Sequence, residues 1–132
     1  MPSILQYEQE DGAVPFKKWF DSLGVRAALK VRTAMAQMEV GNFGDHKSVG
    51  GGVWERRINF EKGYRIYFAK DGNELVLLFW GGTKSRQQND IEKAKDYWSE
   101  YKARKRKLAK EQQAKDQKSK SKKTPKKPRR KK

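Results

Sequence analysis

Basic and aromatic side chains that can act on a phosphate group gather in two neighbouring segments near the middle of the chain. In an extended strand, successive side chains point to opposite faces of the sheet. Arg57 and Asn59 then share one face of the first segment, and Arg65 and Tyr67 share one face of the second. Arginine forks bind phosphate oxygens, and aromatic rings stack on RNA bases. The pattern therefore predicts an anion-binding patch on one face of a sheet.

A short loop, Glu61-Lys62-Gly63, connects these two segments. Its glycine suits the tight turn of a β-hairpin, so the segments are predicted to pair as antiparallel strands. We expect the register that places Asn59 opposite Arg65 and Arg57 opposite Tyr67. Directly opposed side chains are neighbours on one face, so this register would bring all four together.

An unbroken apolar run at 75–79 predicts a third strand, from Glu74 to Trp80, that is covered on both faces. Asp71-Gly72 is a strong hairpin signal and connects this strand to the second one. Ser85 to Gln88 matches the capping box that opens a helix. Lys84 lies between the strand and that helix, where its side chain can reach over the sheet face.

These residues suggest a metal-independent cleavage of RNA, which needs a base, charge stabilisation at the phosphorane and an acid. We expect a catalytic set of Arg57, Arg65, Tyr67 and Lys84. The arginines would hold the phosphate, and Tyr67 would serve as the acid or stack on a base. A lysine that is crowded by arginines has a lowered pKa, which would make Lys84 or Lys47 a base.

Further candidates are expected to bind RNA: Lys47, Arg56, Asn59 and Arg86. Arg56 has the parity of the core face, so it must extend past a helix or lie at the sheet margin. A purely structural reading also stands, in which Arg57 pairs with Glu55 and Tyr67 fills a cross-strand contact. The chain has no cysteine and a single histidine, and we expect neither a metal site nor a cofactor.

The other patterns predict an α+β fold, with two N-terminal helices packed on an antiparallel sheet of about four strands and a C-terminal helix. Ser3 to Tyr7 is predicted as a first strand, and Pro15 to Leu23 and Val25 to Val40 as amphipathic helices. A glycine-rich connector at 41–52 lacks the order of a phosphate-binding P-loop. The C-terminal helix is predicted to begin after Ser85.

Charge is distributed unevenly along the 132 residues, whose net charge is +16. Residues 1–98 carry 15 Lys or Arg against 13 Asp or Glu, whereas residues 99–132 carry 17 against 3. We predict one domain at 1–101 and a basic tail at 102–132, helical to about residue 115 and disordered from Lys118. The tail is either solvated and dispensable or attracted to nucleic acid phosphates.

No window of the sequence approaches the length of an apolar membrane span, and the N-terminus shows no secretory signal. We therefore expect a cytoplasmic protein that does not contact a membrane.

The motifs described so far also occur together in a known family. The runs VWERRINFEKGYRIYF and LVLLFWGGTKSRQQNDIEKAK, with the connector GNFGDHKSVGGG before them, resemble the HigB-like addiction module killer proteins. These are toxins of the RelE/ParE superfamily in type II toxin–antitoxin systems. The resemblance covers roughly residues 3 to 98 and leaves out the basic tail.

The resemblance implies a RelE-like fold whose open sheet face meets mRNA, usually on the ribosome, and a cognate antitoxin that neutralises the toxin. It implies that basic residues on this face carry a nuclease activity, in agreement with the residue pattern. Two alternatives remain open: a non-enzymatic toxin of the ParE type that inhibits DNA gyrase, and an inactive relative that binds nucleic acid. The antitoxin is expected to cover the patch or to displace the C-terminal helix.

Overall fold

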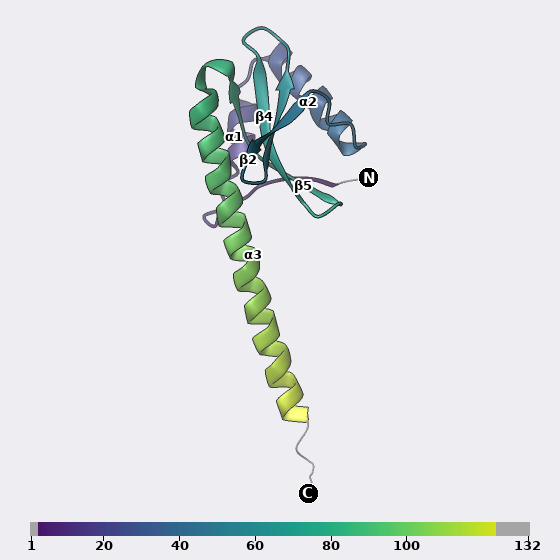
Figure 1. Ribbon diagram of the computed structural model, residues 1–132, viewed down its shortest axis with the longest axis vertical. Coiled ribbons are helices and arrows are strands. Elements are labelled where there is room, and N and C mark those ends of the chain that lie inside the picture. The colour runs from purple at the N-terminus through teal and green to yellow at the C-terminus, as the bar shows by residue number, and fades with distance from the viewer. Residues whose placement is uncertain (1–2, 124–132) are drawn as a thin grey trace, which may run out of the picture. The chain divides into compact units, whose positions relative to one another are not determined.

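The computed structural model describes residues 3–123, with side chains to residue 116. Its elements are β1 (Ser3–Gln6), α1 (Pro15–Asp21), α2 (Val25–Glu39), β2 (His46–Gly50), β3 (Val53–Ile58), β4 (Tyr64–Asp71), β5 (Leu75–Thr83), a 3₁₀ turn η1 (Lys84–Arg86) and α3 (Gln87–Lys123). The fold is α+β, as the sequence predicts, with a five-stranded mixed sheet and a C-terminal helix (Figure 1).

The strands lie in the order β1-β5-β4-β3-β2, and the sheet is mixed because β1 pairs with β5 in parallel. The prediction of about four antiparallel strands is wrong on both points. The unforeseen strand is β2, which lies inside the glycine-rich connector and pairs with the edge of β3. Glycine weakens the local strand signal in this connector, and β2 is stabilised by antiparallel pairing with β3, which follows it after a turn at Gly51 and Gly52.

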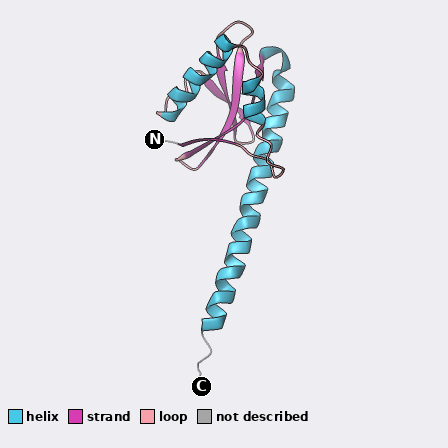
Figure 2. Cartoon of the chain, turned by 180° about the vertical axis from the view of Figure 1, so that it is seen from behind, coloured by secondary structure: helices cyan, strands magenta, loops and turns pink. Residues whose placement is uncertain are grey.

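Helices α1 and α2 cover one face of the sheet, and α2 lies in front of the strands when the molecule is seen from behind (Figure 2). Proline at the first position of α1 suits a helix start, since its missing N–H would have no partner there. The main hydrophobic core lies between these helices and the sheet. The buried side chains include Phe16, Trp19, Val31, Met38, Ile58, Ile66, Phe68 and Leu78.

The opposite face of the sheet is covered by the first turns of α3. Ile91 and Ala94 are buried there, and the Trp98 ring lies 6.0 Å from that of Phe79 between centroids. The expectation of an open sheet face is therefore wrong over the middle of the sheet. Exposed surface on this side is left at the end of the sheet where β3 ends and β4 begins.

The chain divides into two units, 1–99 and 100–132. In the second unit α3 continues to Lys123, so it runs past the predicted end near residue 115. The disorder predicted from Lys118 stays a prediction, and residues 124–132 lie outside the described part. Within that part, no helix is both long and apolar enough to cross a membrane.

Candidate functional site

The β3–β4 hairpin has a different register from the predicted one. Arg57 lies opposite Arg65, and Glu55 lies opposite Tyr67. Strand β3 ends at Ile58, so the loop is longer than the three residues that the sequence suggested. The consequence is that two arginines stand side by side at the hairpin end, although like charges in this position repel. Each arginine has its own carboxylate partner.

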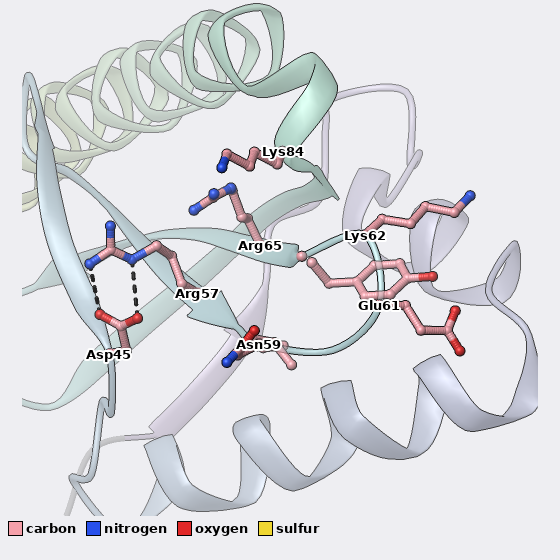
Figure 3. Close-up of a pocket in the computed structure, with 10 residues that line it drawn as sticks. Asp45, Arg57, Asn59, Glu61, Lys62, Arg65 and Lys84 are labelled. Atoms are coloured by element: carbon pink, nitrogen blue, oxygen red, sulfur yellow. Dashed lines mark hydrogen bonds and ion pairs between the residues drawn. The ribbon is translucent and has the colours of Figure 1, made fainter.

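A cleft of about 330 Å³ opens at this end of the hairpin (Figure 3). Its lining residues are Asp45, Arg57, Ile58, Asn59, Glu61, Lys62, Gly63, Tyr64, Arg65 and Lys84. The structure therefore brings together three of the four predicted catalytic residues, Arg57, Arg65 and Lys84, and adds Asn59. The volume lies at the lower end of the range for small-ligand sites, which suits one phosphodiester group and its sugar.

Two strands and the 3₁₀ turn supply the cationic groups. Arg57 lies on β3, Arg65 on β4, and Lys84 directly follows β5, where its backbone N–H donates to Gly63 O at 3.1 Å. This bond holds the 3₁₀ turn against the hairpin loop. The charged ends of Arg65 and Lys84 point toward the side of Arg57, whereas Lys62 extends away from them (Figure 3).

Arg57 is bound by Asp45 in a bidentate pair that is exposed to solvent. Its Nη2 donates to Asp45 Oδ1 at 2.7 Å and its Nε donates to Oδ2 at 3.2 Å. The hydrogen bond from Arg57 lowers the pKa of the Asp45 carboxyl, so the pair stays charged well below neutral pH. A substrate phosphate would have to share Arg57 with the Asp45 carboxylate or displace that carboxylate.

Arg65 is paired with Glu55, which the sequence reading had assigned to Arg57. Arg65 Nη1 donates to Glu55 Oε1 at 3.1 Å, and Glu55 is completely buried. The second carboxylate oxygen, Oε2, accepts from Gln87 Nε2 at 2.7 Å. Gln87, which the sequence analysis did not name as a candidate, is part of this network. The parity of Glu55 was the available signal, since it shares its face with the patch.

Tyr67 lies beneath α3 and not in the cleft. Its side chain is 0% exposed, and its hydroxyl has no hydrogen-bond partner among the described residues. Burial raises the pKa of this hydroxyl far above its usual value, with the negative charge of Glu55 adding to the effect. In this arrangement the hydroxyl cannot donate a proton to a substrate in the cleft.

If the chain cleaves RNA, as its sequence predicts, replacing Tyr67 by phenylalanine should leave that cleavage unchanged. It should keep or raise the free energy of unfolding, by up to about 1 kcal/mol, because a buried unpaired hydroxyl is removed. Urea denaturation and a cleavage assay of the same preparation check both points. A large loss of cleavage with intact stability would restore Tyr67 as the acid and require α3 to move.

Of the predicted RNA-binding residues, only Asn59 lines the cleft. Lys47 is exposed on β2 and Arg86 is exposed on η1, both outside the cleft lining. Arg56 is 8% exposed on the helix-covered face, where its Nη2 donates to Gln37 Oε1 at 2.6 Å. Its role as an RNA ligand is contradicted, because the parity that we noted turns the guanidinium toward α2 and away from solvent.

Asp90 and His46 are two further titratable side chains, and both lie outside the cleft lining. Asp90 is 3% exposed and accepts a hydrogen bond from Trp80 Nε1 at 2.9 Å. His46 is partly buried, with Nδ1 within 2.8 Å of Gly44 O. Among residues 3–116, no group of three His, Asp or Glu side chains is placed to hold a metal ion.

Comparison with known proteins gives one informative match. An uncharacterized protein of Haemophilus influenzae is 42% identical over 81 residues, which are 61% of this chain and 82% of that protein. The relative is therefore shorter than this chain. No family model matches the sequence.

Proposed function

The chain belongs to the same family as the Haemophilus influenzae protein, and we propose that it is the toxin of a type II toxin–antitoxin system that cleaves translated mRNA. One observation carries the proposal: Arg57 on β3, Arg65 on β4 and Lys84 on η1 line one open cleft. Cationic groups that converge on a cleft of this size suit a phosphodiester, and an α+β domain with this topology is compatible with the HigB-like, RelE-like resemblance.

The chemistry is an attack of the ribose 2′-oxygen on phosphorus, which breaks the bond to the 5′-oxygen of the next nucleotide. The products are a 2′,3′-cyclic phosphate and a free 5′-hydroxyl. Arg65 and Arg57 stabilise the additional negative charge on the phosphorane oxygens. Lys84 is exposed and forms no ion pair with the described residues, so it is the group available to exchange a proton with the reacting oxygens.

The proposed nuclease function implies two partners, an RNA substrate and an antitoxin protein. The substrate is mRNA on the ribosome in the cytoplasm, and Asn59 offers an amide that can hydrogen-bond a base or sugar at the cleft. A cognate antitoxin would neutralise the toxin by covering the cleft or by displacing the first turns of α3.

The decisive experiment induces the protein in bacteria and maps new 5′ ends of mRNA. Growth arrest with cuts inside translated frames supports the nuclease. Growth arrest with intact mRNA and a DNA-damage response would favour inhibition of DNA gyrase. The absence of arrest would point to a relative that binds nucleic acid without cutting it.

Deletion of residues 102–132 should leave the domain folded, because the buried core lies within residues 3–98. The same deletion should weaken binding to nucleic acid at low salt and flatten the dependence of the binding constant on salt, since fewer counterions are released. Thermal denaturation and fluorescence titrations at several salt concentrations test both expectations. Loss of cooperative unfolding, or an unchanged salt dependence, would contradict them.

A further inference from the structure

A buried carboxylate lies behind the cleft and is bonded on both of its oxygens. Glu55 on β3 is 0% exposed, accepts from Arg65 Nη1 through Oε1 and accepts from Gln87 Nε2 through Oε2. Gln87 is the first residue of α3 and Arg65 lines the cleft. A continuous hydrogen-bonded path therefore runs from the start of α3 to the candidate catalytic group.

This path restricts the orientation of the Arg65 guanidinium. The group is planar, so a bond at Nη1 limits the directions in which its other nitrogens can point. Arg65 Nε is buried and has no hydrogen-bond partner in the described part of the chain. Nη2 is then the nitrogen left to meet an anion in the cleft. The bond from Gln87 keeps the Glu55 carboxylate from turning, which keeps Arg65 in place.

Arg57 lies opposite Arg65 on β3 and allows an exposed ion pair to be compared with the buried one. It has a carboxylate partner too, but that pair with Asp45 is exposed, with Arg57 37% and Asp45 64% accessible. An exposed pair exchanges partners easily, whereas the Glu55–Arg65 pair is 0% and 9% accessible and is held by a third residue. A buried ion pair is weak evidence for stability, while preorganised donors are what an anion site requires.

We propose that Glu55 and Gln87 are positioning residues for Arg65, and that the first turn of α3 is the fixed support that aims its guanidinium at a phosphate in the cleft. The geometric part of this inference, that Glu55 and Gln87 fix the orientation of Arg65, does not depend on the proposed function. Its catalytic consequence rests on the proposed nuclease function.

The geometric part is tested in the free protein by the rate at which the Arg65 Nε proton exchanges with water, followed by NMR. Gln87→Ala should accelerate this exchange about tenfold or more, because the carboxylate is released and the guanidinium opens to solvent. Gln88→Ala is the matched control, since the Gln88 side chain is exposed and, among the residues with described side chains, bonds only Glu92, at 3.3 Å. Unchanged exchange in Gln87→Ala overturns the inference, whether or not the protein cuts RNA.

The catalytic part is tested by single-turnover cleavage of mRNA on programmed bacterial ribosomes with the enzyme in excess. Gln87→Ala should lower the maximal rate about 10- to 100-fold, as loss of a supporting hydrogen bond does in other sites, with little change in the half-saturating enzyme concentration. In an Arg65→Ala background the same change should have no further effect. An equal loss in both backgrounds would show that Gln87 acts independently of Arg65 and would overturn the catalytic part. A wild type that does not cleave would instead remove the proposed function and leave the exchange result to decide the positioning.

Discussion

Replacing Lys84 by alanine should slow RNA cleavage about 10²–10³-fold, the usual effect of removing one group that stabilises or protonates a transition state. The fold should not suffer. The Lys84 side chain is exposed, and the bonds to Gly63 and Gln87 are made by its backbone, which alanine keeps. Single-turnover cleavage and urea denaturation of one preparation measure the two effects separately.

Arg86→Ala is the matched control for this change. Arg86 lies on the same 3₁₀ turn and is exposed, and its replacement removes the same charge outside the cleft lining. It should weaken RNA binding slightly through the general attraction of phosphates and leave the maximal rate nearly unchanged. Equal rate losses in Arg86→Ala and Lys84→Ala would mean that net charge, and not the cleft, controls cleavage.

Replacing Arg65 by alanine should lower the free energy of unfolding by about 3–5 kcal/mol, because it leaves a fully buried carboxylate without its counter-charge. A double variant, Glu55→Met with Arg65→Met, should recover most of this loss, since apolar side chains of similar volume replace a buried ion pair at little cost. Urea denaturation of the single and double variants gives the comparison. A double variant as unstable as Arg65→Ala would show that the loss comes from packing and not from the unpaired charge.

Arg57→Ala provides the contrast from the opposite strand. Its ion pair with Asp45 is exposed, so its loss should leave the free energy of unfolding nearly unchanged. The two arginines therefore differ as probes of function. An inactive Arg65→Ala protein is informative only after its folded fraction is known, whereas Lys84→Ala and Arg57→Ala report on the cleft directly.

Strand alternation in the sequence was sufficient to predict which side chains of the hairpin share a face. Ile58, Ile66 and Phe68 lie in the core as their parity requires, and Arg57 and Arg65 lie together on the other side. The position of Lys84 between strand and helix was also readable, because an apolar run followed by glycines marks the strand end. These features depend on neighbours within a few residues, where covalent geometry sets the directions of side chains.

The tertiary structure decided the register of the β3–β4 hairpin, the hydrogen-bond partners of Glu55 and the part of the sheet that α3 covers. The loop after Ile58 took two more residues than the turn signal implied, which moved Arg57 from Tyr67 to Arg65. Glu55 found its partners 10 and 32 residues away, and α3 covered the face on which Tyr67 had been predicted to act. The burial of Tyr67 shows the same dependence on distant contacts.

The sequence by itself therefore determined the α+β class, the segregation of the basic tail and the set of cations available for a phosphate. Only the folded chain decided which of them meet in a cleft and which are buried. The physical reason is that a side chain's direction follows from its own strand. Its charge state, exposure and partners depend on the segments packed against it, whose identity is not encoded within any short stretch.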